Sequence, residues 1–306
     1  MSAAAPFTRI AVIGLGLLGG SVTRAVHANL PDAMTTGFDA DPAVRERARE
    51  IGLANFVPET VAEAVTGADL VVLCVPVGSM AQAGASIAAH LAPGVIVTDV
   101  GSSKASVAKA LAEALPGVTV IPAHPVAGTE QSGPDAGFAA LFRNRWCIVT
   151  PPAGADEGDV ARVAAFWEAL GARVETMDAE HHDRVLAVTS HLPHLIAYTI
   201  VGTASDLEEV TQSEVIKYSA GGFRDFTRIA ASDPTMWRDV FLSNRDAVLE
   251  MLQRFSEDLT ELQKAIRKGD GATLFDTFTR TRAIRRSIIE MGQDDARPDF
   301  GRSHEG

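Results

Sequence analysis

The chain has 306 residues, of which 46% are hydrophobic and 22% are charged, and its formal net charge is −12. This length allows two domains with a sizeable core, since domains usually contain about 100–200 residues. The negative charge argues against a nucleic-acid partner, which requires a clustered basic face, and leaves small metabolites as the expected ligands.

Neither the N-terminus nor the cysteines indicate an exported protein. Residues Met1–Thr8 lack the basic start and apolar stretch of a signal peptide, and no apolar run looks long enough to span a bilayer. Cys74 and Cys147 form neither a disulfide framework nor a metal-binding set, so we expect two buried thiols. The expected location is the cytoplasm, with no membrane partner.

Three glycines in G-x-G-x-x-G spacing follow the apolar run Ile10–Ile13. Gly14 would let the chain turn tightly out of a strand, Gly16 would leave room for a pyrophosphate, and Gly19 would let a helix pack on the strand. The helix N-terminus would bind the phosphates. The predicted cofactor contacts in this turn are Gly14, Leu15, Gly16, Leu17, Leu18 and Gly19.

Asp39 ends a second strand-like run, Met34–Phe38. An acidic residue about 20 positions beyond the glycines can accept hydrogen bonds from the adenosine ribose, and its charge would repel a 2′-phosphate. We therefore predict NAD rather than NADP as the cofactor. The alternative is a structural glycine turn with a solvated Asp39.

Strand-like and helix-like segments alternate from Arg9 to about Thr150, which predicts a Rossmann-type doubly wound parallel sheet. Asp41-Pro42 reads as an N-cap followed by proline and opens a helix through Glu50. The runs Asp69–Pro76 and Val95–Val100 are apolar throughout, as in strands covered on both faces. Ligands of such sheets bind beyond the carboxyl ends of the strands, and we include Val75 and Pro76 among the cofactor contacts.

Two segments at predicted carboxyl ends carry candidate polar groups. Ser102 follows the 95–100 strand, and it could contact both cofactor and substrate, although a simple helix cap by Ser102 or Ser103 is equally open. His124 follows the strand Val118–Pro122 on a stiff, proline-flanked connection. Its imidazole could accept a proton at neutral pH, although a lone histidine is more often structural.

From about Asp178 the strand signals stop and helical periodicity begins. Pro193, within Ser190–His194, should kink or locally open a helix spanning Leu186–Thr203. The four histidines between 181 and 194 allow a zinc interpretation, but the proline and the absence of an H-E-x-x-H pattern favour binding of an anionic substrate without a metal.

The segment from Lys217 to Ala230 combines glycines, aromatic residues and two arginines. It suggests a tight loop that delivers a guanidinium to a partly closed site, where bidentate carboxylate binding is strongest. The alternative is an ion pair between Asp225 and Arg228 that only fixes the loop.

Ser232-Asp233-Pro234 is a helix start, and the helix is predicted to run to Lys268 and stop at Gly269. It would be about 50 Å long at about 1.5 Å per residue, more than one compact domain covers. Its apolar residues form two rows on one face, which predicts a homodimer. The rows are Phe241, Val248, Phe255 and Leu262, and Leu252, Leu259 and Ile266. A last helix over about Thr273–Met291 precedes a polar tail that we expect to be disordered.

With these segments in place, the chain resembles the prephenate/arogenate (cyclohexadienyl) dehydrogenase family of tyrosine biosynthesis. The resemblance extends from Arg9 to about Met291. It is carried by Gly-Ser-x-Lys at 101–104, His-Pro-Val-Ala-Gly-Thr-Glu at 124–130, Ser-His-Leu-Pro-His at 190–194, Gly-Gly-Phe-Arg-Asp-Phe-Thr-Arg-Ile-Ala at 221–230 and Ser-Asp-Pro-x-Met-Trp-Arg-Asp at 232–239.

The resemblance implies an NAD-dependent oxidative decarboxylation of prephenate, of L-arogenate, or of both. His124 would hydrogen-bond the substrate hydroxyl and help to remove its proton, assisted by Ser102, while Arg228 would bind a substrate carboxylate. The other implied substrate-site residues are His194, Thr129, Glu130, Asp225 and Trp237.

The predicted organisation is an NAD-binding Rossmann domain at 1–178, an all-helical substrate and dimerisation domain at 179–292, and a tail at 293–306. Two other functions stay open. A β-hydroxyacid dehydrogenase would open its helical domain with Gly-x-x-x-Lys-x-x-x-Asn, which this chain lacks. A non-catalytic NAD-sensing protein would not need His124, His194 and Arg228 to converge.

Overall fold

The computed structural model describes residues 5–129, 131–211 and 221–290, and the chain divides into two compact units, Met1–Leu249 and Glu250–Gly306. The predicted tail at 293–306 lies outside the described residues. The first unit contains all the strands described below and the candidate site, so it is the unit on which function depends.

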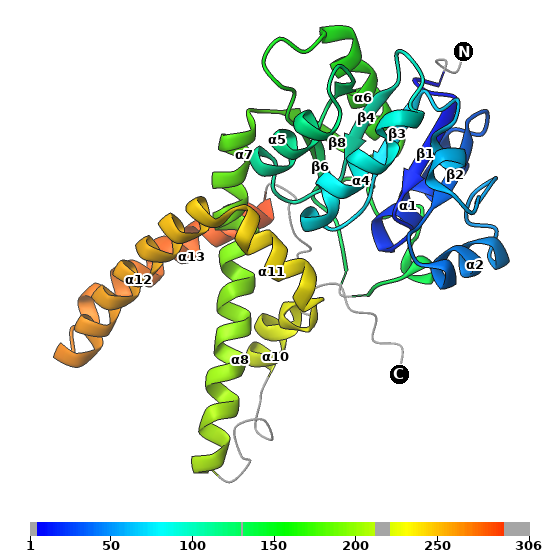
Figure 1. The fold of residues 1–306 in the computed structure, drawn as a ribbon. Helices are drawn as coiled ribbons and strands as arrows, with labels where there is room; N and C mark the ends of the chain where they lie inside the picture. Colours follow the sequence, from blue (N-terminus) through cyan, green and yellow to red (C-terminus); the bar gives the residue numbers. More distant parts are fainter. Residues whose placement is uncertain (1–4, 130, 212–220, 291–306) are drawn as a thin grey trace. The chain divides into compact units, whose positions relative to one another are not determined.

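A five-stranded parallel sheet forms the centre of the first unit, in the order β2-β1-β3-β4-β5 (Figure 1). The register pairs Ile13 with Phe38 and Leu73, and Leu73 with Asp99, so the carboxyl ends of four strands meet at one edge. The strands are β1 (Arg9–Ile13), β2 (Met34–Phe38), β3 (Leu70–Leu73), β4 (Ile96–Asp99) and β5 (Thr119–Val120).

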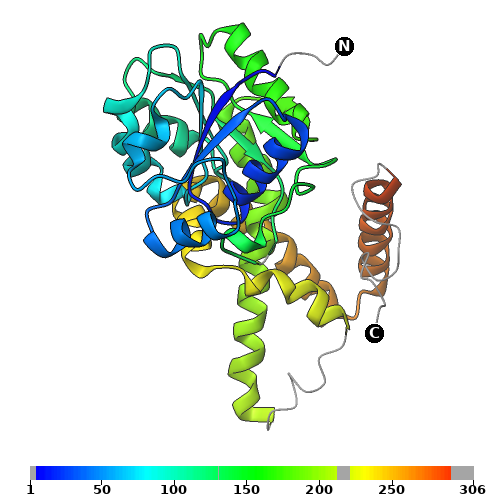
Figure 2. The same ribbon diagram turned by 90° about the vertical axis from the view of Figure 1, so that its right-hand side faces the viewer.

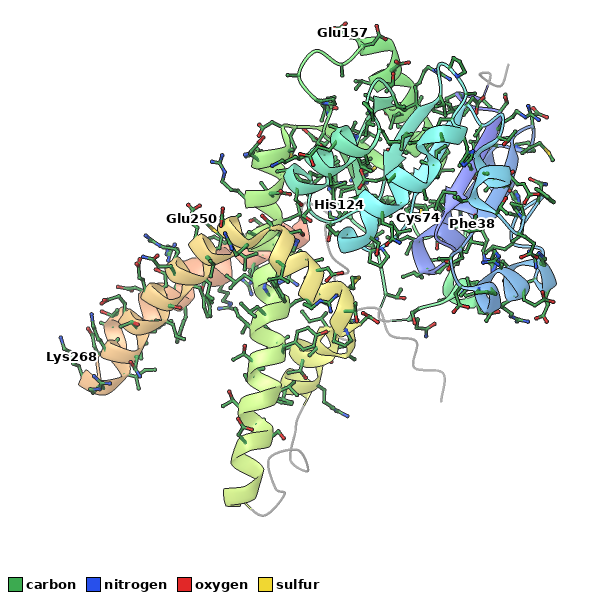
Figure 3. All side chains as sticks on the ribbon, viewed as in Figure 1. Phe38, Cys74, His124, Glu157, Glu250 and Lys268 are labelled. Carbon is green, nitrogen blue, oxygen red and sulfur yellow. The ribbon has the colours of Figure 1, made fainter. Side chains whose placement is uncertain are left out.

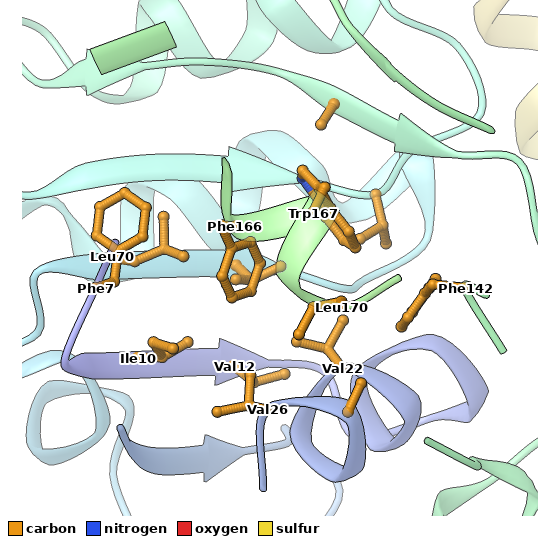
Figure 4. Close-up of a cluster of buried hydrophobic side chains, with 14 of the residues drawn as sticks. Phe7, Ile10, Val12, Val22, Val26, Leu70, Phe142, Phe166, Trp167 and Leu170 are labelled. Atoms are coloured by element: carbon orange, nitrogen blue, oxygen red, sulfur yellow. The ribbon is translucent and has the colours of Figure 1, made fainter. Parts of the chain in front are cut away.

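Helices cover both faces of this sheet, as expected for a doubly wound fold. Ile10 and Val12 of β1 face one hydrophobic cluster with α1 (Leu17–Asn29) and α6 (Glu157–Ala169), which Figure 4 shows with Phe166 and Trp167 at its centre. Ala11 and Ile13 face a second cluster with helices from the opposite layer. That layer contains α3 (Val61–Val65), α4 (Met80–Ile87) and α5 (Ala105–Ala114), while α2 (Pro42–Glu50) and the short turns η1 (Val77–Ser79) and η2 (Ala88–His90) complete the connections.

A second sheet of three strands follows the first, in the order β6-β7-β8. β6 (Ala123–Pro125) pairs antiparallel with β7 (Trp146–Val149), which pairs parallel with β8 (Arg173–Thr176), and η3 (Pro134–Ala136) lies in the connection. The sequence predicted His124 on a connection after a strand, whereas it lies within β6, opposite Ile148. The strand pairs on either side of it, Ala123 with Val149 and Pro125 with Cys147, therefore fix the backbone of this histidine.

The helical part begins with α7 (Ala179–Leu186), whose N-cap Asp178 accepts a hydrogen bond from the His181 amide. A π-helical turn, η4 (Ala187–His191), then leads into α8 (Leu192–Thr211). Because Pro193 cannot donate a backbone hydrogen bond, the helix widens just before it, as the sequence predicted. In Figures 1 and 2, α8 extends away from the sheets.

One helical stretch among the described residues, Ala179–Asp206, is long and apolar enough to cross a membrane, with a mean hydropathy of 1.4 over its best window. The expectation that no run has this length and composition was therefore wrong. A single such helix is weak evidence for a membrane span, because helices that pack against protein meet the same criteria. Only 28% of that window is buried within the chain.

The two segments after residue 220 differ from their predictions. Gly221–Thr227 forms helix α10 rather than a loop, and the 3₁₀ turn η5 (Arg228–Ala231) follows it. The helix predicted to run to Lys268 is instead two helices, α11 (Pro234–Ser243) and α12 (Arg245–Lys268). Asn244 interrupts them because its side chain donates to the Asp183 carbonyl and contacts His191, which holds its backbone outside helical geometry.

The second unit contains most of α12 and the helix α13 (Gly271–Glu290). The 24 residues of α12 correspond to about 36 Å, and Gly269 ends the helix with a φ of +67°. The break at Asn244 removes Phe241 from the predicted apolar rows. Leu259 and Ile266 remain more than half exposed on α12.

Candidate active site

The glycine turn has the geometry that a bound pyrophosphate requires. Gly14 has a φ of +96°, and an added Cβ at Gly19 would lie 1.8 Å from the Gly14 carbonyl oxygen, so both positions need glycine. An added Cβ at Gly16 meets nothing within 4 Å. The backbone at the start of α1 is therefore open to a phosphate group, which suits a dinucleotide at this helix N-terminus.

Asp39 is tied to the same turn. Its carboxylate accepts hydrogen bonds from the Leu15 amide at 2.8 Å and the Asp41 amide at 3.0 Å. A carboxylate has about four acceptor positions, so it can still accept from a ribose hydroxyl. The two amides hold it in place for this contact.

The chain that leaves β3 closes the turn on its other side. An added Cβ at Gly14 would lie 2.6 Å from the Cys74 carbonyl oxygen and 3.2 Å from the Val75 side chain. Pro76 is exposed next to Val75, and Leu17 and Leu18 are half-buried at the start of α1. Figure 3 labels Phe38 and Cys74 at the ends of β2 and β3, with His124 in the second sheet. The predicted cofactor residues of this edge thus lie around one turn.

The turn after β4 is fixed differently from the sequence prediction. Neither Ser102 nor Ser103 caps α5; the amides of Lys104 and Ala105 instead donate to the two carboxylate oxygens of Asp183 at 2.7 and 3.0 Å. Ser103 bonds to the Ser243 hydroxyl at 2.6 Å, and Ser102 remains half-buried. A carboxylate from α7 therefore replaces the local serine cap.

His124 is one of three buried histidines at this site, with His182 and His191. Its Nδ1 lies 2.9 Å from Nε2 of His182, and Nδ1 of His182 lies 2.8 Å from a carboxylate oxygen of Asp183. Burial lowers the pKa of His124 well below its usual range, and the Lys104 charge lowers it further. Burial also lowers the pKa of His182, although its hydrogen bond to Asp183 opposes this. Both imidazoles are therefore neutral at pH 7.

A buried ion pair holds the residue before His124. The Lys104 ammonium donates to the Asp99 carboxylate and, at 2.7 Å, to the Ala123 carbonyl, while the Ala123 amide donates to Asp99 at 3.3 Å. Both charged side chains are fully buried. The pair thus binds both polar backbone groups of Ala123 and fixes the start of β6.

A second group gathers around Trp237. The His194 ring stacks on Trp237 with 3.6 Å between centroids, and its Nδ1 donates to the Ser190 carbonyl at 2.9 Å. Burial lowers the pKa of His194, although its bond to Ser190 opposes this, and the positive charge of Arg228 lowers it further. Arg228 opens η5, which packs against α8. Three predicted substrate-site residues, His194, Trp237 and Arg228, are therefore together.

His191 connects the two groups. It contacts Trp237 edge to face at 6.1 Å, its Nδ1 accepts from Asn244 at 3.1 Å, and it contributes to the lowered pKa of His124. Burial lowers the pKa of His191 itself to about 4, although the nearby Ser102 backbone opposes this. The neutral ring then carries its proton on Nε2.

The other three predicted substrate-site residues differ in exposure and in whether the structure describes them. Thr129 is exposed after β6, Asp225 is half-buried in α10, and Glu130 lies outside the described residues. Among the described residues, no group of three or more His, Cys, Asp or Glu side chains is placed to hold a metal ion. The rings of His182, His191 and His194 each hydrogen-bond a protein group.

Sequence reasoning placed His182 among four histidines for an anionic substrate but did not link it to His124, and it missed Asp183 and Asn244 as part of this site. His182 and Asp183 lie 58 and 59 positions after His124, so no local pattern links them. A signal was present, however, since positions 182, 183 and 186 share one helical face and all three are buried. A buried charged residue on such a face indicates a specific partner.

This fold and this site define a dinucleotide-binding oxidoreductase with a helical second part. The chain belongs to the prephenate dehydrogenase family. The family description "Prephenate dehydrogenase, nucleotide-binding domain" matches residues 22–176, and "Prephenate dehydrogenase, dimerization domain" matches residues 178–280.

Individual relatives agree with this assignment. A cyclohexadienyl dehydrogenase of Zymomonas mobilis is 45% identical over 92% of this chain and 96% of its own length. A prephenate dehydrogenase of Bacillus subtilis is 31% identical, covering 95% of this chain and 78% of its own. The crystal structure of Aquifex aeolicus prephenate dehydrogenase with hydroxyphenyl propionate and NAD⁺ superposes with a TM-score of 0.86 at 31% identity, covering 92% of this chain and 98% of that one.

Proposed function

We propose that this chain catalyses the NAD-dependent oxidative decarboxylation of prephenate to 4-hydroxyphenylpyruvate, of L-arogenate to L-tyrosine, or of both. The observation that carries the proposal is His124, a buried and neutral imidazole held in β6 beside the turn that follows β4. A neutral imidazole can accept a proton at pH 7, as this reaction requires. The family assignment supports the same chemistry.

The proposed chemistry needs one proton acceptor and one carboxylate ligand. The glycine turn would hold NAD, with Asp39 accepting from its ribose, and NAD would supply the hydride acceptor. His124 takes the proton of the ring hydroxyl as the hydride leaves the same carbon, and it returns the proton to the phenolate oxygen after the ring carboxylate departs as CO₂. Aromatisation favours the reaction, so the chain's main tasks are orientation and proton transfer.

We assign the substrate side to the group around Trp237. Arg228, which lies close enough to affect the His194 pKa, would bind a substrate carboxylate through its guanidinium, as guanidinium groups do well. His194 donates through Nδ1 to Ser190, so its Nε2 can accept a hydrogen bond from the substrate. Glu130 and Asp225 are proposed to order the site entrance, Thr129 to contact the substrate, and Ser102 to assist His124 and contact the cofactor.

The test follows the absorbance of NADH after purified protein is mixed with NAD and prephenate, and in a second assay with NAD and L-arogenate. Each is repeated with NADP. NADH formation with either substrate and weak activity with NADP are expected. No NADH from either substrate would refute the proposal and leave the NAD-sensing and hydroxyacid alternatives.

The role of His124 is tested with His124→Asn. This variant should retain NAD binding while kcat falls by about two or more orders of magnitude, the usual contribution of a general base. His90→Asn is the matched control, because His90 is exposed in η2. Near-normal turnover in His124→Asn would remove this residue from the mechanism. For Arg228→Ala we expect mainly a raised KM, and an unchanged KM would exclude the carboxylate contact.

We also propose a homodimer formed through the helical part. Support comes from the match to a dimerization domain and from apolar side chains that are more than half exposed on α12 and α13, including Leu259, Ile266 and Phe275. Sedimentation at micromolar protein should give twice the monomer mass. A cytoplasmic location fits the two cysteines, Cys74 and Cys147, which are unpaired thiols.

A further inference from the structure

Three buried side chains form a line that ends at the proposed base. His124, His182 and Asp183 are 7%, 0% and 5% exposed, and the two hydrogen bonds between them measure 2.9 and 2.8 Å. His124 belongs to the second sheet, whereas His182 and Asp183 belong to α7. Buried polar groups at these distances are hydrogen-bonded in a definite direction.

The direction is set at the Asp183 end of the line. Both Asp183 oxygens accept backbone N–H groups, from Lys104 and Ala105. With both oxygens engaged by amides, Asp183 acts here as a carboxylate, and a carboxylate can only accept. The His182 Nδ1 must therefore carry a hydrogen and donate it to Asp183.

The same reasoning carries through to His124. Neutral His182 has its hydrogen on Nδ1, so its Nε2 has a lone pair and must accept from Nδ1–H of His124. Neutral His124 then has its lone pair on Nε2. Within the described residues, Nε2 makes no hydrogen bond, so it is the ring atom left for an incoming hydroxyl proton.

We propose that His182 and Asp183 are positioning residues that hold His124 in the tautomer whose Nε2 accepts the substrate proton. This inference rests on the proposed function of His124. When Nε2 takes the proton, the imidazolium keeps its Nδ1–H bond to His182, and the Asp183 carboxylate lies one residue further along the line. Its negative charge stabilises the positive charge on His124, as in other base-orienting carboxylates.

Asp183 also couples this line to the turn that holds Ser102. The carboxylate that orients His182 is the same one that binds the first amides of α5, directly after Ser102 and Ser103. The base and the cofactor-side turn are thereby fixed by one group.

The experiment compares two substitutions of His182 in the full-length protein. In His182→Gln the side-chain oxygen can reach the position of Nε2 and still accept from His124, whereas His182→Leu fills the site with no acceptor. We expect kcat within about 10-fold of wild type for the Gln variant and at least about 100-fold lower for the Leu variant, with KM changed by less than about 3-fold in both. Equal losses in the two variants would overturn the proposal.

A second measurement does not depend on turnover. Nitrogen-15 NMR of imidazole-labelled wild-type protein at neutral pH distinguishes protonated from unprotonated ring nitrogens, and the His124 signals are those absent from His124→Asn. A hydrogen on Nδ1 and none on Nε2 is expected, and a hydrogen on Nε2 would overturn the proposal. If wild-type protein formed no NADH, the proposed function would fail while this spectrum still decided the tautomer. If His182→Leu failed to fold, the spectra of wild type and His182→Gln would decide it.

Discussion

Replacement of Lys104 by Met tests the buried ion pair that fixes the start of β6. Met has a similar length without a charge, so the substitution leaves the Asp99 carboxylate buried without its cation. Removing one partner of such a pair costs about 3–5 kcal/mol. The amides of Gly101 and Ala123 still bind Asp99, which favours the lower end of this range, while the Ala123 carbonyl loses a donor worth about 1 kcal/mol.

The expected total is about 4 kcal/mol, a large part of the roughly 5–15 kcal/mol that stabilises a typical protein. For a unit of this size it corresponds to a fall in Tm of about 8–16 °C. Scanning calorimetry of Lys104→Met should show this fall in the Tm of the unfolding transition that NAD binding moves to higher temperature. Lys109→Met is the matched control, because Lys109 lies exposed on α5, the helix that begins directly after Lys104.

A double variant separates the charge from the packing. Asp99→Asn with Lys104→Met removes both charges, so it should regain part of the lost stability. A loss below about 1 kcal/mol in Lys104→Met, or a double variant less stable than that single one, would refute the reasoning that an unpaired buried carboxylate causes the effect.

Two further predictions concern the glycine turn and the histidines. Gly19→Ala should destabilise the protein by more than about 2 kcal/mol and abolish NAD binding, because its Cβ would lie 1.8 Å from the Gly14 carbonyl oxygen. The added Cβ of Gly16→Ala meets open space, so in urea unfolding this variant should stay within about 1 kcal/mol of wild type. It should nevertheless weaken NAD binding. Equal stabilities of the two variants would contradict this. Because burial lowers the pKa of His191 to about 4, the unfolded chain takes up this proton first as the pH falls, and up to about 3 kcal/mol of stability should be lost between about pH 6.5 and pH 4. His191→Gln should lose stability less steeply with falling pH in the same window, and an unchanged pH dependence would exclude this residue as the cause.

The elements that the sequence predicted well have short-range causes. The N-cap side chains of Asp41 and Asp233 bond to amides two and three residues ahead, and Gly14 turns the chain directly after β1. The apolar runs that became β3 and β4 are buried on both faces, as their composition indicates. Each of these features depends on neighbours within a few positions.

The features that escaped prediction depend on contacts between distant residues. Helical periodicity continues through Asn244, and only its bonds to Asp183 and His191 show why the helix breaks there. The two serines before α5 are good caps by composition, yet Asp183 occupies that place. No pattern within a window of sequence reports a partner 53 to 79 positions away.

Because Asp183 lies after residue 178, the residues proposed to bind the nucleotide and the residues that orient the base come from different parts of the chain. The glycine turn, Asp39 and the chain after β3, which we propose to bind the dinucleotide, all precede residue 178, and residues 22–176 match the nucleotide-binding domain of the family. The groups that orient His124 and close the N-terminus of α5 come from the first helix after residue 178. A natural or engineered exchange of the helical half that began at residue 178 would therefore carry the orientation of the base with it, and substrate range and proton transfer would be inherited together.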